Sequence, residues 1–134
     1  FASVGDSRIY LARSGSLIPL TRPHVYASDL DKRAARGELP FESALADSQR
    51  SALTSYVGMG ELEALDHSAR GLQLLSGDWV LLMTDGVFNT LDDDEIAALL
   101  YGNAQTAAER IESRVVARGL PHQDNLTVVA LRIL

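Results

Sequence analysis

The feature that most constrains the fold is a run of five apolar residues, 79–83 (WVLLM), that stops abruptly at Thr84, Asp85 and Gly86. A short uninterrupted apolar run bounded by turn residues is typical of a buried β-strand. The acid that follows would then stand at a strand end, and the glycine would let the backbone turn sharply or pass close to a ligand. The sequence therefore predicts a core strand that carries one carboxylate to the edge of a sheet.

Two other acids occupy similar positions. Asp124 stands just before the apolar run 126–131, and Asp6 follows the strand-like segment 1–4. Several carboxylates at strand ends suit a hard divalent cation, because Mg²⁺ and Mn²⁺ prefer carboxylate and water oxygens. The pattern predicts Asp6, Asp85 and Asp124 as metal ligands.

Each of these acids also has a plainer interpretation. Asp85 could cap the turn that follows it, and Asp124 could form a local Asx turn with Asn125 as its helper. Asp6 could be a turn acid that pairs with Arg8. The residues alone leave these alternatives open.

The remaining pattern indicates strands at both ends of the chain, with most helices towards the C-terminus. The predicted strands are residues 1–4, 8–13, 16–20, 62–65, 71–75, 79–84 and 126–133. The predicted helices are residues 25–37, 40–47, a segment that begins at a capping box from Asp92 to Glu95, and 104–118. Ser14-Gly15 is a hairpin signal. This order favours an α+β layered domain.

Composition narrows the classes of function. The length of 134 residues and the apolar content of 46% suit one domain with a packed core. The net charge of −6 argues against a nucleic-acid partner. The chain has no cysteine, which rules out thiolate metal sites and fits a cytoplasmic location. Every apolar run is shorter than the ~20 residues that span a bilayer, so we expect no membrane partner within this segment.

Five segments, in this order, resemble the protein phosphatase 2C family of metal-dependent serine/threonine phosphatases, bacterial type. Each is similar to one block of that family, although a proline replaces the usual aspartate in the second. The segments are residues 4–10 (VGDSRIY), 20–24 (LTRPH), 53–58 (LTSYVG), 77–87 (GDWVLLMTDGV) and 124–129 (DNLTVV).

The resemblance implies a layered β-sandwich of antiparallel sheets flanked by helices, with metals at one edge. It implies hydrolysis of phosphoserine or phosphothreonine in proteins by a water that two Mn²⁺ or Mg²⁺ ions activate. Asp85 and Asp124 would hold one metal, and Asp6 would serve a weaker third site. Gly5, Gly86 and Asn125 would supply metal-site backbone.

Other polar residues receive smaller roles. Asn89 stands where some family members have a carboxylate, and a neutral amide puts the third metal in doubt. The acids 92–94 are interpreted as a charged helix start rather than as ligands. His24 is expected to pack and form hydrogen bonds, and His122 could contact the metal site through Asp124.

The resemblance also implies that the chain, residues 1–134, is the C-terminal portion of one phosphatase domain, incomplete at its N-terminus. Residues 25–53 fall where the family has a variable flap beside the active site. The bridging aspartate and phosphate-binding arginine would lie upstream, so we expect this chain alone to be inactive. Its unpaired strands could join in a strand-exchanged homodimer. The alternative function is a pseudophosphatase or a regulatory sensor that keeps the fold without catalysis.

Overall fold

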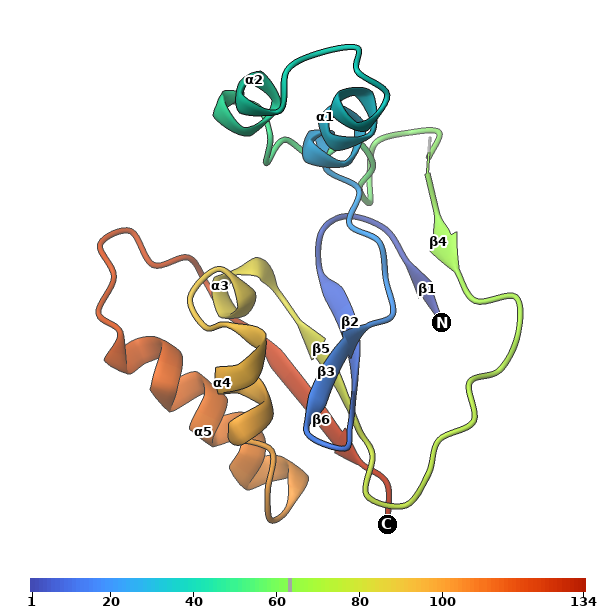
Figure 1. Cartoon of the computed structure of the whole chain (residues 1–134). Coiled ribbons are helices and arrows are strands. Elements are labelled where there is room, and N and C mark those ends of the chain that lie inside the picture. Colours follow the sequence, from blue (N-terminus) through green and yellow to red (C-terminus); the bar gives the residue numbers. More distant parts are fainter. Residues whose placement is uncertain (63) are drawn as a thin grey trace. The chain divides into compact units, whose positions relative to one another are not determined.

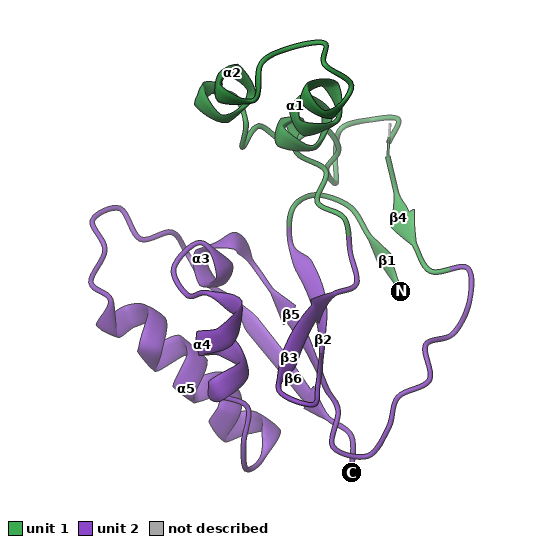
Figure 2. Cartoon of the chain, in the orientation of Figure 1, with its two compact units in different colours: residues 1–6, 22–68 green, residues 7–21, 69–134 purple. Residues whose placement is uncertain are grey.

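The computed structural model describes residues 1–62 and 64–134. These residues form two compact units, which Figure 2 shows in separate colours. Unit 1 comprises Phe1–Asp6 and Arg22–Ser68, and unit 2 comprises Ser7–Thr21 and Ala69–Leu134. Each unit is therefore built from two separate stretches of the chain.

Unit 2 contains a four-stranded antiparallel sheet. In spatial order its strands are β3 (Ser16–Pro19), β2 (Arg8–Arg13), β5 (Trp79–Met83) and β6 (Val128–Arg132). At the centre of β5, Leu81 pairs with Tyr10 on one side and with Ala130 on the other. The apolar run 79–83 is thus an interior strand, as its composition predicted.

The predicted hairpin joins β2 and β3. Ser14 and Gly15 both have positive φ angles, 54° and 80°. Two consecutive positive φ angles characterise the two-residue turn whose twist matches that of the flanking strands. Arg13 therefore pairs directly with Ser16.

Helices cover one face of this sheet (Figure 1). They are α3 (Asp85–Phe88), α4 (Asp93–Ala98) and α5 (Ala104–Ala117). The core of unit 2 lies between them and the sheet and consists of Tyr10, Leu81, Met83, Val87, Leu91, Ile96, Ile111 and Val115. The Asp92 side chain accepts a hydrogen bond from the Glu95 amide, which confirms the acids 92–94 as a helix start.

A partly buried ion pair between Arg13 and Asp78 holds the loop before β5. The Asp78 carboxylate accepts hydrogen bonds from Arg13 Nε at 2.9 Å and Nη2 at 2.5 Å, and from the Leu75 amide at 2.7 Å. These donors lower the pKa of Asp78 to about 2. Asp78 lies within the block 77–87, and its contacts are structural.

Unit 1 is smaller and has its own apolar cluster. It contains a two-stranded antiparallel sheet of β1 (Ala2–Ser3) and β4 (Asp66–His67), and two helices, α1 (Tyr26–Ala35) and α2 (Phe41–Ala46). The buried residues of the cluster are Leu30, Ala34 and Ala44. The predicted flap-like insertion, residues 25–53, falls within this unit.

The α+β class, with antiparallel sheets and flanking helices, is confirmed. The strand predicted at residues 71–75 is wrong, because this segment connects β4 to β5 without strand pairing. The strand predicted at 62–65 includes Glu63, which lies outside the described residues. The four-residue helix α3 was missed, because one turn is too short to produce a helical periodicity.

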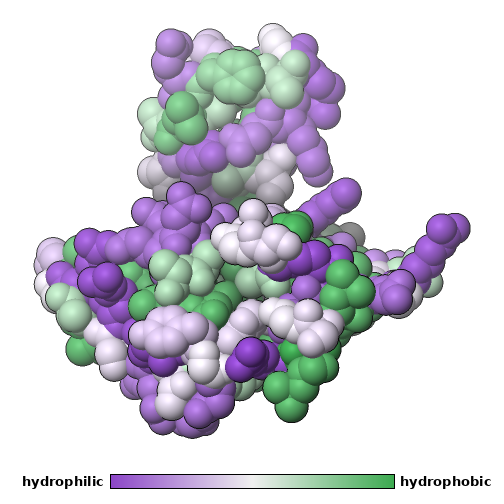
Figure 3. Space-filling model, turned by 60° about the horizontal axis from the view of Figure 1, so that its bottom comes forward, coloured by the Kyte–Doolittle hydropathy of each residue, from purple (hydrophilic) through white to green (hydrophobic). Residues whose placement is uncertain are grey.

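In the described part of the chain, none of the helices has the length and apolar character needed to cross a bilayer. Apolar side chains nevertheless reach the surface, as the green atoms of Figure 3 show. Side chains alternate between the two faces of a strand. Leu82, Val129 and Leu131 therefore lie on the sheet face opposite the core, and they are 40%, 48% and 47% exposed.

We expect this face and the edge strand β6 to make the 134-residue chain associate at micromolar concentration, since exposed apolar faces and unpaired edges favour pairing. Replacing Val129 and Leu131 together by lysine should shift the chain towards monomer in sedimentation velocity. Val116→Lys is the control, because Val116 is also exposed but lies on α5. A compact monomer with sharp, cooperative unfolding in the unsubstituted chain would contradict the expectation.

The Arg13–Asp78 pair predicts a pH dependence of stability. The pKa of Asp78 is about 2 in the folded chain, below its ordinary value of 3.8. The unfolded state therefore binds this proton first as pH falls, so the stabilisation is complete above about pH 5 and is lost progressively towards pH 2. In urea unfolding, Asp78→Asn should lower stability at pH 6 and flatten its decline between pH 4 and 2. Glu112→Gln, at an exposed position of α5, should change neither.

Candidate metal centre

The site begins where β5 and β6 separate. Beyond the last strand pair, the Thr84 amide donates to the Thr127 carbonyl at 3.1 Å, and the Thr127 amide donates to Thr84 Oγ1 at 2.9 Å. The Thr84 hydroxyl therefore joins the two strands instead of capping α3. This reciprocal pair fixes the distance between the strand ends that carry Asp85 and Asp124.

Gly86 then brings the two acidic segments into direct contact. A Cβ atom placed on Gly86 would lie 2.4 Å from the Asn125 carbonyl oxygen and 3.2 Å from the Asp124 carbonyl oxygen. Real Cβ atoms do not approach backbone so closely, so only glycine fits. The sequence predicted that Gly86 would turn the backbone or let it pass close to a ligand, and the structure shows that its close neighbour is the chain itself.

A side-chain network holds this contact from one side. Gln123 Nε2 donates to the Gly86 carbonyl at 3.0 Å and to the Asp124 carbonyl at 3.2 Å. Thr90 Oγ1 lies 3.0 Å from Gln123 Oε1 and 2.9 Å from the Gly86 carbonyl. Sequence reasoning missed both residues, because a glutamine and a threonine 33 positions apart carry no recognisable spacing.

Asp85 and Asp124 line one hollow of about 260 Å³, together with Asn89 and His122. Asp124 Oδ1 accepts the amide of the next residue, Asn125, at 2.7 Å, whereas an Asx turn would use the amide two residues on. This local contact is compatible with metal ligation, because a carboxylate can accept several partners at once. The hollow offers oxygen donors of the kind that Mg²⁺ and Mn²⁺ prefer.

Two carboxylates are a small ligand set. Among the described residues, three or more acidic or histidine side chains do not gather within reach of one ion. Mg²⁺ can bind through one or two carboxylates when waters and substrate phosphates complete its shell. The residues present therefore fit a loosely held divalent ion with open positions for water and phosphate.

Asp6 belongs to unit 1, whereas Asp85 and Asp124 belong to unit 2. Within unit 1, the Gly5 amide donates to His24 Nδ1 at 3.2 Å, and the His24 amide donates to the Gly5 carbonyl at 2.9 Å. His24 is thus the hydrogen-bonding residue that was predicted, and it fixes the turn that carries Asp6. The predicted metal roles of Asp6 and Gly5 stay predictions.

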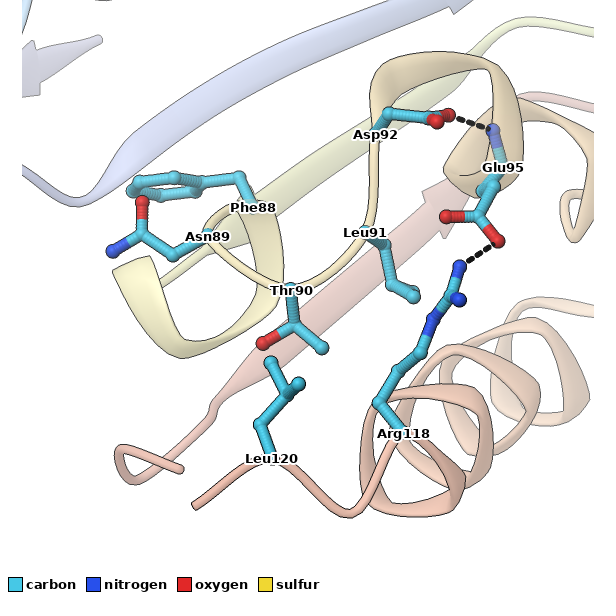
Figure 4. A pocket seen from close by; sticks show the side chains of 8 residues that line it. All are labelled: Phe88, Asn89, Thr90, Leu91, Asp92, Glu95, Arg118 and Leu120. Carbon is cyan, nitrogen blue, oxygen red and sulfur yellow. Dashed lines mark hydrogen bonds and ion pairs between the residues drawn. The ribbon is translucent and has the colours of Figure 1, made fainter. Parts of the chain in front are cut away.

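A second hollow, of about 450 Å³, adjoins the first and shares Asn89, Thr90 and Leu120 with it. Figure 4 shows Leu91 between Thr90 and Arg118, with an ion pair from Arg118 to Glu95. Two of the charged groups that line it, Arg118 and Glu95, thus pair with each other, and the Asp92 carboxylate accepts the Glu95 backbone amide.

Comparison with known proteins identifies the class. No family model matches the sequence. A protein of the protein phosphatase 2C type from Streptococcus pyogenes is 29% identical over 128 residues, which are 96% of this chain and 50% of that protein. Protein phosphatase PhpP from Streptococcus pneumoniae is 32% identical over 129 residues, with the same coverage. The chain spans about half the length of these curated relatives.

Solved structures agree with the sequence relatives. The S. agalactiae serine/threonine phosphatase matches with a TM-score of 0.81 at 29% identity, over 100% of this chain and 53% of that one. The catalytic domain of the phosphatase PstP in complex with two manganese ions matches with a TM-score of 0.63 at 28% identity, over 98% and 52%. The chain is thus similar in sequence and fold to the C-terminal part of bacterial protein phosphatase 2C-type serine/threonine phosphatases, which confirms the resemblance seen in its sequence.

The close approach at Gly86 yields a stability prediction. In Gly86→Ala, the new methyl group overlaps the Asn125 carbonyl, so α3 or residues 124–125 must shift at a cost of about 1–3 kcal/mol. Thermal unfolding should show a midpoint lower by several degrees. Gly71→Ala is the matched control, because a Cβ there meets no atom within 4 Å. Equal midpoints for the two variants would show that the site tolerates a side chain.

Proposed function

We propose that the protein containing this chain hydrolyses phosphoserine and phosphothreonine in proteins, in a reaction that depends on Mn²⁺ or Mg²⁺. One observation carries the proposal: Gly86 and the Thr84–Thr127 pair bring Asp85 and Asp124, 39 positions apart in sequence, to one hollow at the end of the sheet. The named activity of the relatives and the two manganese ions of the PstP complex support it.

In this proposal Asp85 and Asp124 hold one metal ion, and Asp6 serves a weaker site. Gly86, Gly5 and Asn125 shape the backbone around them. When bound, such ions lower the pKa of water and neutralise charge on phosphoryl oxygens.

The chain's own contribution is to hold and orient. Asp85 leaves the sheet at the first position of α3, so β5 and the helix together fix its backbone. Asp124 is fixed by the contact of its carbonyl with Gly86 and by the hydrogen bond from Gln123. Asn89 lines the same hollow and presents a neutral amide, which is a poorer cation ligand than a carboxylate. We infer that it leaves a third ion weakly bound.

The second candidate function is a pseudophosphatase or a sensor module that keeps this fold without catalysis. Intact Asp85 and Asp124 favour the enzyme. For either function we propose a cytoplasmic location, which the lack of cysteine fits, and a signalling role, which the named activity of the relatives supports.

Assays of the full-length protein on a phosphopeptide test the proposal. Turnover should require Mn²⁺ or Mg²⁺ and should cease in chelator. Asp85→Asn and Asp124→Asn should each reduce turnover at limiting metal by orders of magnitude, because each removes a charge that holds the dication.

Asp93→Asn is the control, since Asp93 lies in the first turn of α4 and outside the hollow. Activity that survives chelation would reject the metal mechanism. Near-normal turnover of Asp85→Asn would reject that ligand assignment. Manganese binding without turnover of any phosphopeptide would favour the pseudophosphatase.

A further inference from the structure

We propose that Gln123 and Thr90 are positioning residues, which set the geometry of the metal site by cross-linking the two backbone segments that carry Asp85 and Asp124. This inference rests on the proposed function and adds residues that the family blocks do not contain. Neither side chain needs to touch the metal or the substrate.

The Gln123 amide group is placed to make this cross-link. Its Nε2 carries two hydrogens and has two carbonyl acceptors, Gly86 at 3.0 Å and Asp124 at 3.2 Å. Gly86 directly follows Asp85, so one planar group joins the segments of both candidate ligands. The two segments lie 37 positions apart between Gly86 and Gln123, and this link adds to the Thr84–Thr127 pair that joins the strand ends just before them.

Thr90 fixes the orientation of that amide. Its hydroxyl lies 3.0 Å from Gln123 Oε1 and 2.9 Å from the Gly86 carbonyl, four residues earlier. A hydroxyl carries one hydrogen, so Thr90 donates to Gln123 Oε1 or to the Gly86 carbonyl at any one time. Figure 4 shows the Thr90 hydroxyl pointing away from Leu91, while its methyl group faces that side. Thr90 therefore faces the metal hollow with one group and the adjoining hollow with the other.

The turn before Gln123 supports the same assignment. The backbone amide of Gln123 donates to the Leu120 carbonyl at 3.3 Å, which closes a turn with Pro121 and His122 at its centre. His122 has a φ of 63°, in the left-handed region, which is uncommon for residues other than glycine although histidine is among those enriched there. The hydrogen bonds of Gln123 are placed to hold this conformation.

The physical reason for such a link is electrostatic. Two carboxylates at one hollow repel each other when no cation lies between them, so their backbones need support that does not depend on metal. Hydrogen bonds around metal ligands typically change metal affinity by about 10–100-fold when removed. We therefore expect Gln123 and Thr90 to act on metal affinity more than on overall folding.

The test measures Mn²⁺ binding to the full-length protein by electron paramagnetic resonance of the free ion, beside the thermal midpoint of the metal-free protein. Gln123→Met keeps the length of the side chain and removes its hydrogen bonds. We expect its Mn²⁺ affinity to fall about tenfold or more, while the metal-free midpoint stays within a few degrees of wild type.

Further variants distinguish a positioning role from misfolding. Thr90→Val should weaken Mn²⁺ binding in the same direction, and Thr90→Ser, which keeps the hydroxyl, should restore it. The combined Gln123→Met and Thr90→Val variant should lose little more than Gln123→Met alone, because the residues act as one unit. Gln105→Met is the matched control: Gln105 also donates a side-chain hydrogen bond, to Glu109 at 2.8 Å, but on α5.

The outcomes distinguish failure of the proposed function from failure of the positioning role. Failure of the wild-type protein to bind Mn²⁺ would overturn the proposed metal-dependent function itself. Normal binding by the wild type and unchanged affinity in Gln123→Met would overturn only the positioning role. A Thr90→Val variant whose metal-free midpoint collapses while Thr90→Ser fails to restore affinity would assign the network to folding and would also overturn the inference.

Discussion

The close contact between Gly86 and the backbone of residues 124–125 is the constraint on which the candidate site depends. A side chain at position 86 would separate α3 from the segment before β6, and the two acids would move apart with them. The Thr84–Thr127 pair holds the strand ends in register just before the contact. Strand pairing thus brings the two acids to one end of the sheet. The absence of a side chain at Gly86 lets the backbone segments that carry them approach closely.

The packing of unit 2 explains why this end of the sheet is a stable platform. One face of β5 is buried against α3, α4 and α5, where Leu81 and Met83 join a continuous core. The Arg13–Asp78 pair anchors the opposite end of β5. Because β5 is held along its whole length, the residues at its end have little freedom to move. A site that binds an ion needs such rigid support. The other face, with Leu82 and Val129 exposed, contributes nothing to this support.

Sequence reasoning succeeded where a residue's role follows from its immediate neighbours. The apolar run 79–83, the Ser14-Gly15 turn and the cap at Asp92 are local signals, and each formed as predicted. It failed at residues 71–75, whose apolar content suggested a strand, because no neighbouring strand pairs with them. Sequence reasoning also missed α3, because the conformation of a single helical turn depends on its tertiary contacts.

The sequence by itself determined the class of the chain, because five ordered blocks carry the resemblance and the acids stand at strand ends. Only the tertiary structure decided which groups meet. The 2.4 Å approach at Gly86 and the amide of Gln123 between two carbonyls both join segments far apart in the chain. Such contacts depend on strand register and on the placement of helices. The spacing of residues along the chain does not determine these distances.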